Sequence, residues 1–376
     1  MLDQILDEHG VPPDGWAFDR PPLTGALLRR QAAAMTGRAA GEDGWRAEHM
    51  LLMPEGYWAT LAEIWEGFLN GAPMPAALNQ VRTVNIPKEE GGLRPVSIAQ
   101  LLWRIANSAL LAQVAPWVEA WAPEALQGGL KGRSAEHIHA QLMEALDRAR
   151  REGHPFSAVK QDLRKCFDSV RPEVAVHLLR RFGLPEALGR YILRFYEGQN
   201  RWMQAAGATA AAPLKPEISI LQGCPLSCLL LAALMATWVR AVANAAPEVQ
   251  AGIYVDDRFL STDSEEPEGP LEQAVIAGAA ADLALGFLRH PDKKRAAATN
   301  RPLRLRLRPL ADRVGRAKDS LEVLGVHYAF GLRRVRTYKV VRREEADRRL
   351  RRVACVSRAA GMRRKLIRQL VLPMLA

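Results

Sequence analysis

Two adjacent carboxylates, Asp256 and Asp257, stand in the middle of a segment that has strand-forming residues on both sides. Residues 251–261 read Ala-Gly-Ile-Tyr-Val-Asp-Asp-Arg-Phe-Leu-Ser. This pattern predicts a β-hairpin with the two aspartates as its two-residue turn. Neighbouring carboxylates repel one another unless a cation or a raised pKa compensates, so such a turn suits a divalent metal. Asp is also common in plain surface turns, and that reading stays open on this segment alone.

A third carboxylate, Asp162, stands where a predicted strand ends. Residues 156–170 begin with a strand-like alternation and turn polar before a helix start at Pro172 and Glu173. A strand end and a distant hairpin tip can meet at one end of a sheet. Three carboxylates there would suit two divalent ions about 4 Å apart, which activate an attacking hydroxyl and stabilise a leaving phosphate oxygen. The pattern therefore indicates metal-assisted phosphoryl transfer.

Three motifs that contain these aspartates resemble the palm motifs of reverse transcriptases, especially those of the non-LTR retrotransposon and group II intron branch. They are Asp162-Leu-Arg-Lys-Cys-Phe-Asp168, Gln222-Gly-Cys-Pro-Leu-Ser227 and Tyr254-Val-Asp-Asp257. The resemblance covers roughly residues 41–376. It implies an α+β right-hand polymerase with fingers, a palm built on an antiparallel sheet, and a helical thumb.

The same resemblance implies a division of the chain into four parts. Residues 1–40 would be an N-terminal extension, 41–155 a fingers-like region, and 156–328 the palm with some fingers elements. Residues 329–376 would begin a basic thumb that is truncated, because the chain stops where related polymerases continue. We also expect the chain to be a polymerase core or a fragment of a longer retroelement protein, without an endonuclease or RNase H segment.

The resemblance further implies which residues form the site. Asp162, Asp256 and Asp257 would be catalytic, and with Leu163 they would hold two Mg²⁺ ions, or Mn²⁺ in their place. Substrate binding would fall to Lys88, Arg94, Phe167, Gln222, Gly223, Lys293 and Lys294. The implied partners are an RNA template, a DNA or RNA primer, and deoxynucleoside triphosphates.

The chemistry of these side chains agrees with the implied substrate roles. Lys88 and Arg94 flank the turn of a predicted hairpin, where a point-charge lysine and a forked arginine suit a triphosphate. Phe167 beneath the sugar of an incoming nucleotide would clash with a 2′-hydroxyl and favour deoxynucleotides. Lys293 or Lys294 could protonate the departing pyrophosphate, and the register leaves the choice open. Without the resemblance, surface charges and a core phenylalanine would explain the same residues.

Arg258 departs from the family pattern. Matching enzymes mostly have a small or apolar residue directly after the paired aspartates, whereas this chain has a long cation. We expect that Arg258 could pair with Asp257 and compete with a metal. Two alternatives to a reverse transcriptase therefore stay open: a catalytically inactive nucleic-acid-binding remnant of a retroelement polymerase, and an RNA-directed RNA polymerase.

The charge of the chain is unevenly distributed. The net charge is +11, but residues 301–376 contain 22 Lys and Arg against 6 Asp and Glu. The first 300 residues contain 30 basic and 35 acidic residues. A basic C-terminal part beside an acidic remainder is expected if the C-terminal part contacts a polyanion and the rest contains metal-binding acids. A solvated arginine-rich helix is the alternative.

Composition favours a globular intracellular protein. The chain has 376 residues and 48% hydrophobic content, enough for two or three subdomains with cores of their own. Its four cysteines lack the paired spacing of a zinc site, which indicates a reduced compartment. The most apolar run, 226–239, is shorter than the roughly 20 residues that cross a bilayer, so we expect a buried helix and no membrane contact. We expect a nuclear location in a eukaryote and otherwise a cytoplasmic one, and the oligomeric state stays open.

Overall fold

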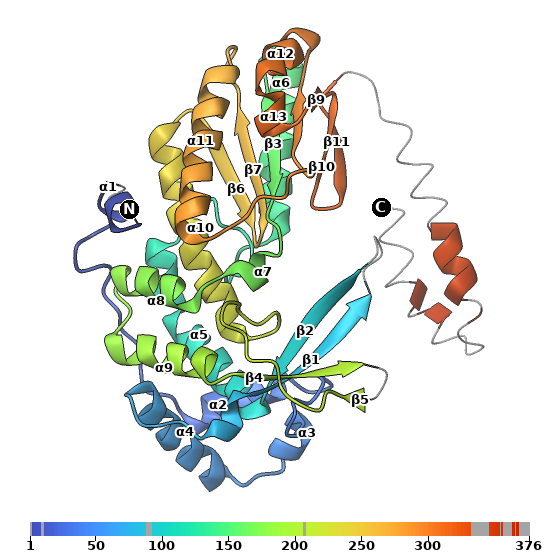
Figure 1. The fold of residues 1–376 in the computed structure, drawn as a ribbon. Coiled ribbons are helices and arrows are strands. Elements are labelled where there is room, and N and C mark those ends of the chain that lie inside the picture. The colour runs from blue at the N-terminus through green and yellow to red at the C-terminus, as the bar shows by residue number, and fades with distance from the viewer. Residues whose placement is uncertain are drawn as a thin grey trace.

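A computed structural model describes residues 2–8, 11–87, 92–205, 208–331, 346–353, 355, 363–364 and 366–367. The predicted thumb, 329–376, therefore lies largely outside the described residues. The predicted triphosphate ligand Lys88 lies wholly outside them. In the described part, helices and mostly antiparallel sheets form an α+β fold (Figure 1). A five-stranded sheet stands in the upper half of the view and a four-stranded sheet in the lower half.

The helical elements are of very different lengths, and the long ones form the core. They are α1 (Leu2–Glu8), α2 (Gly25–Ala33), α3 (Ala47–Met50), α4 (Glu55–Leu69), η1 (Ala76–Asn79), α5 (Leu101–Trp121), α6 (Ala135–Glu152), α7 (Cys166–Ser169), α8 (Pro172–Arg181), α9 (Glu186–Glu197), α10 (Pro225–Ala245), α11 (Glu268–Leu285), α12 (Arg301–Arg306), η2 (Arg308–Leu310) and α13 (Ala311–Val314).

The strands form three sheets. They are β1 (Gln80–Pro87), β2 (Leu93–Ala99), β3 (Ser157–Asp162), β4 (Asn200–Ala205), β5 (Ala208–Thr209), β6 (Gln250–Tyr254), β7 (Asp257–Thr262), β8 (Arg295–Ala298), β9 (Ala317–Lys318), β10 (Ser320–Val323) and β11 (Val326–Ala329). The strand orders are β6-β7-β3-β8-β9, β2-β1-β4-β5 and β10-β11.

The five-stranded sheet is covered on both faces, and β3 lies at its centre. Successive side chains of a strand point to opposite faces. Accordingly Val159 belongs to the large core that contains α10, whereas its neighbour Ala158 belongs to a second core with Ile138 and Leu146 of α6. Burial on both faces explains why β3 reads as an almost continuous buried strand. It also fixes the register, because a slip by one residue would exchange the two faces.

The central helix α10 confirms the expected buried helix and is longer than predicted. Pro225 occupies its first turn, where a missing N–H costs nothing, and the helix runs for 21 residues. Its length and composition would allow a membrane span, and 83% of its most apolar window is buried inside the protein. It packs against α11, α8 and α5, and it also contacts β6 of the five-stranded sheet.

The four-stranded sheet contains the hairpin predicted around residues 81–97. β1 and β2 pair antiparallel from Val81 opposite Ala99 to Pro87 opposite Leu93, and β4 adds to β1 in parallel. The residues at the turn of this hairpin, 88–91, lie outside the described residues.

The predicted N-terminal extension contributes side chains to the large core that also contains residues of α4 and α5. Thr24 caps α2 by accepting a hydrogen bond from the Leu27 amide at 3.2 Å, as its residue type favours. Leu28 and Ala32 are fully buried, and α2 packs on α4 and α5.

Candidate active site

The end of β3 and the tip of the β6–β7 hairpin meet at one end of the five-stranded sheet. Asp162 and Asp257 are direct cross-strand partners in the antiparallel β3–β7 pair. Directly opposite residues have Cα atoms about 5 Å apart and project from the same face. The convergence of these two carboxylates, which the sequence predicted from far-separated segments, is therefore confirmed.

The hairpin turn lies one residue earlier than predicted. The turn residues are Val255 and Asp256, and Asp257 is already the first residue of β7, opposite Tyr254. Val255 has φ of 59°, a conformation that is strained for a β-branched side chain. A positive φ at the first turn residue alone is the pattern of a type II′ turn. The prediction was wrong here because turn chemistry favours aspartates and glycines, and valine gives no signal for this conformation.

A loop at residues 125–128 contacts the backbone of the β6–β7 hairpin next to its turn. The Gln127 amide donates to the Ile253 carbonyl at 2.8 Å, and the Ile253 amide donates to the Ala125 carbonyl at 2.8 Å. A Cβ on Gly128 would lie 2.3 Å from the backbone nitrogen of Val255. Only glycine permits this approach, and the strained turn is thereby held in place by a second backbone segment.

The carboxylates at the tip act on one another. Burial raises the pKa of Asp256, and the negative charges of Asp257 and Asp162 raise this pKa further. The guanidinium of Arg94 on β2 lowers the same pKa. Arg94, on the four-stranded sheet, therefore acts electrostatically on the carboxylates at the end of the five-stranded sheet.

Lys160 is a residue of the site that the sequence reading missed. Its Nζ lies 3.0 Å from Oδ1 of Asp257, and it also lies over the ring of Phe259, 5.7 Å from the centroid. The alternation of β3 could have found it, because Lys160 stands two residues before Asp162 and so projects from the same face.

The structure separates the two candidate lysines. Nζ of Lys293 lies 3.1 Å from Oδ2 of Asp162, at the carboxylate cluster. Lys294 instead donates from Nζ to the backbone carbonyl of Asp312 at 2.5 Å. Of the two candidate lysines, Lys293 therefore lies at the carboxylate cluster, whereas Lys294 is held by α13.

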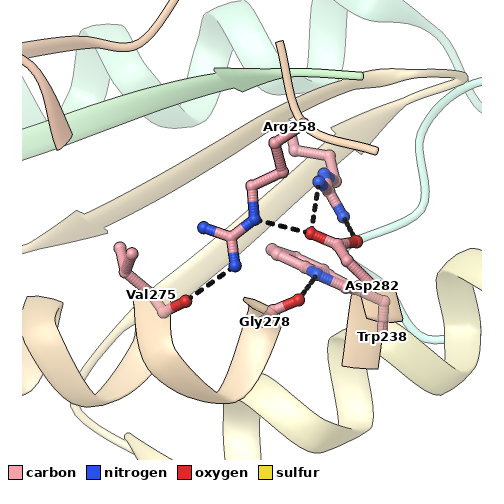
Figure 2. A network of polar contacts seen from close by, with 6 residues as sticks. Trp238, Arg258, Val275, Gly278 and Asp282 are labelled. Atoms are coloured by element: carbon pink, nitrogen blue, oxygen red, sulfur yellow. Dashed lines mark hydrogen bonds and ion pairs between the residues drawn. The ribbon is translucent and has the colours of Figure 1, made fainter. Parts of the chain in front are cut away.

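Arg258 faces away from the carboxylate cluster, which corrects the expectation that it could pair with Asp257. It is the cross-strand partner of Gln161 and lies on the opposite face of the sheet, fully buried. Its guanidinium donates to both carboxylate oxygens of Asp282 at 2.5 and 3.0 Å and lies over the Trp238 ring (Figure 2). The physical reason is the period of two along β7, which puts neighbouring residues on opposite faces.

The predicted nucleotide-binding turn before α10 contacts the four-stranded sheet. The Ser97 amide of β2 donates to the Gln222 carbonyl at 2.9 Å. Gly223 has φ of 119°, and a Cβ there would lie 2.5 Å from the Ser97 carbonyl oxygen. The Ile220 amide also donates to the Phe167 carbonyl at 2.9 Å. These contacts join the backbone at Phe167 and the turn at Gln222 to β2, the strand that bears Arg94, while the roles of these residues toward a nucleotide stay predictions.

A family model for reverse transcriptase (RNA-dependent DNA polymerase) matches residues 86–328. The chain belongs to the reverse transcriptase family. The matched residues include all three aspartates and the turn before α10 that is predicted to bind a nucleotide.

Two known proteins illustrate what this reverse transcriptase domain is similar to. A retrovirus-related Pol polyprotein from the type-1 retrotransposable element R2 of Nasonia vitripennis is 25% identical over 260 residues. The alignment covers 63% of this chain and 24% of that relative, so the chain spans less than a quarter of its length. The structure of apo telomerase from Candida tropicalis, truncated from the C-terminal domain, aligns with a TM-score of 0.50. It is 13% identical, with 74% of this chain and 59% of that chain covered, and the likeness concerns the fold: an α+β right-hand polymerase.

The donor set of the reverse transcriptase domain fits a divalent metal by its chemistry. Carboxylate oxygens are the ligands that Mg²⁺ prefers, and a cation would relieve the repulsion that raises the pKa of Asp256. Among the residues that the structure describes, no group of three or more acidic, histidine or cysteine side chains is arranged to hold a metal ion. Lys160 and Lys293 instead hold Asp257 and Asp162. Leu163 is buried and carries no side-chain ligand atom, so its predicted metal contact would need its carbonyl oxygen.

Proposed function

We propose that the chain is an RNA-directed DNA polymerase that extends a primer on an RNA template with deoxynucleoside triphosphates. The observation that carries the proposal is the cross-strand pair of Asp162 and Asp257, with Asp256 in the adjoining turn, in a chain of the reverse transcriptase family. The five-stranded sheet would be the palm, and the sheet that contains Arg94 would belong to the fingers.

In this proposal the three carboxylates and the Leu163 carbonyl would hold two divalent ions, with Mg²⁺ as the ordinary metal and Mn²⁺ as a substitute. Bound there, the ions would supply charge neutralisation and activation of the primer hydroxyl. Protein catalysis of phosphoryl transfer is mainly positioning and electrostatics, which suits a site built on strand ends and a tight turn.

The remaining proposed roles are those that the resemblance implied, and the positions of Arg94 and Lys293 support two of them. Arg94 would bind the triphosphate, because its charge already acts at Asp256. Lys293, at the carboxylate cluster, would deliver a proton to the departing pyrophosphate. Phe167 would select deoxynucleotides by crowding a 2′-hydroxyl. The backbone at Gln222 and Gly223 would contact the nucleotide and the template base.

The proposal is tested with the full chain on poly(rA) primed with oligo(dT), in Mg²⁺, with either dTTP or UTP. Wild type is expected to extend the primer with dTTP and to discriminate against UTP, and Asp256→Asn is expected to bind the duplex without extending it. Duplex binding without extension by the wild type would indicate a noncatalytic nucleic-acid-binding remnant. A preference for UTP would indicate an RNA polymerase.

A further inference from the structure

A buried ionic cluster lies directly behind the carboxylates, on the opposite face of the sheet. Arg258 and Asp282 have side-chain exposures of 0% and 3% and form a bidentate pair. Arg289 donates from Nε to Oδ2 of Asp282 at 2.8 Å and from Nη2 to the Val275 carbonyl at 3.0 Å. We call these three residues, Arg258, Asp282 and Arg289, the rear cluster.

The rear cluster is joined to both carboxylate-bearing backbones, covalently to that of Asp257 and by backbone pairing to that of Asp162. Arg258 directly follows Asp257 on β7. Arg289 forms a β-bridge with Leu163, the residue after Asp162, and the next amide, that of His290, donates to the Asp162 carbonyl at 2.9 Å. One carboxylate on α11, Asp282, therefore links the strand that bears Asp257 to the segment that pairs beside Asp162.

Packing around the rear cluster leaves little freedom for the Arg258 side chain. The guanidinium carbon lies 4.4 Å from the centroid of a Trp238 ring on α10. Trp238 donates from Nε1 to the Gly278 carbonyl of α11 at 3.0 Å. A Cβ on Gly278 would lie 2.9 Å from that ring. The cluster is thus enclosed by two core helices in close contact.

A buried ion pair is weak evidence for stability, because desolvation offsets much of the attraction, but it can specify one arrangement among several. In β7, a slip by one residue would move Arg258 to the front of the sheet and Asp257 into the apolar core. Arg258 reaches Asp282 in the observed register. The ionic contact with Asp282 therefore adds a directional contribution to the register, in addition to the burial that an apolar residue at position 258 would also provide.

We propose that Arg258, Asp282 and Arg289 are positioning residues that fix the relative placement of Asp162 and Asp257 for divalent metal binding. This inference rests on the proposed function, since it concerns the same metal site. None of the three residues touches the proposed reacting atoms. They act through the two backbones to which they are joined.

The test measures Mn²⁺ binding to the full chain without nucleic acid, from the electron paramagnetic resonance signal of the free ion. Asp282→Asn keeps the side-chain shape and removes the anion that links the two arginines. We expect it to weaken Mn²⁺ binding by about tenfold or more, as removal of a residue that orients metal ligands does. The Mg²⁺ concentration for half-maximal primer extension is expected to rise by a similar factor.

Glu66→Gln is the matched control. Glu66 also forms a bidentate pair with an arginine, Arg20, at 2.7 and 2.9 Å, and it lies on α4 at the far end of the molecule from β7 (Figure 1). It is expected to lower the melting temperature while leaving Mn²⁺ affinity unchanged. A second variant, Arg258→Met with Asp282→Leu and Arg289→Met, replaces the whole cluster by apolar groups, so that folding is retained while the directional hydrogen bonds are removed.

Weaker Mn²⁺ binding in both rear-cluster variants, with unchanged binding in Glu66→Gln, would support the inference. Wild-type Mn²⁺ affinity in both would overturn it and leave the cluster a purely structural feature. A wild type that binds Mn²⁺ but extends no primer would overturn the proposed polymerase activity alone. The two failures are therefore distinguishable.

Discussion

Asp256 combines three influences that disfavour its ionised form: burial, the charge of Asp257 and the charge of Asp162. Its folded-state pKa is therefore above the ordinary value of 3.8. Without a metal, the ionised carboxylate destabilises the folded chain above that raised pKa, and the penalty disappears below 3.8, where the group is protonated in both the folded and the unfolded chain.

Asp256→Asn is consequently expected to raise the melting temperature at pH 7 in the presence of a chelator, although it removes a proposed metal ligand. The gain should shrink as the pH falls toward 3.8. Thermal unfolding between pH 4 and pH 8, with the exposed Asp263→Asn as control, measures this gain. A lower melting temperature for Asp256→Asn at pH 7 would contradict the electrostatic account.

The two adjacent lysines give a second prediction. Lys293→Met is expected to slow single-turnover nucleotide incorporation by about 100-fold, the ordinary size of a general-acid contribution. Lys294→Met removes a hydrogen bond to the Asp312 carbonyl and should affect thermal stability more than the rate. Equal rates for the two variants would remove Lys293 from the proposed proton transfer.

For single residues, the sequence predicted which two carboxylates meet better than it predicted where the neighbouring side chains point. Asp162 and Asp257 were placed together correctly, because motif order and strand ends constrain them. The pairing of Arg258 with Asp257 was predicted from their adjacency in the chain. Its actual partner, Asp282, stands 24 residues away on α11, and the sequence does not show which face of that helix meets β7. Lys160 was missed although its spacing from Asp162 indicates a common face.

The β6–β7 hairpin depends on another element for its conformation. Gly128 lies against the backbone of the Val255 turn, so a side chain there must displace the turn itself. The sequence predicted the hairpin from its alternation, but it predicted neither the strained valine nor the supporting loop, since both result from contacts between distant segments.

Gly128→Ala is therefore expected to move Asp256 and to abolish most primer extension while the chain still folds. Gly252→Ala is the matched control, because Gly252 lies in β6 of the same hairpin and a Cβ there meets nothing within 4 Å. It should leave extension unchanged and favour the strand slightly. Comparable extension by the two alanine variants would show that the loop does not hold the turn.

For the molecule as a whole, the resemblance of three motifs predicted the α+β polymerase fold. The strand orders and the packing of the helices became known only from the structure. The boundaries of fingers, palm and thumb stay predictions. The strongly basic part after residue 301 carries the expectation of duplex binding, and most of it beyond residue 331 lies outside the described residues.

Charge-driven duplex binding makes a prediction about salt. Replacing Arg333, Arg334 and Arg336 by Gln should flatten the plot of log affinity against log salt by about 0.9 for each phosphate that is no longer neutralised. Replacing the exposed Arg29, Arg30 and Arg38, which lie in or after α2, removes the same charge and should leave the slope unchanged. Equal slopes for the two triple variants would place the nucleic-acid contact elsewhere.

The central claim, that Asp162, Asp256 and Asp257 form one metal-dependent polymerase centre, is tested most directly by copying a defined RNA of mixed sequence with all four dNTPs. The full chain should make DNA complementary to that RNA when Mg²⁺ is present and none when it is chelated. Asp162→Asn and Asp256→Asn, changed on two separate segments, should each abolish the product while retaining duplex binding. Complementary DNA made at the wild-type rate by either variant would contradict the claim.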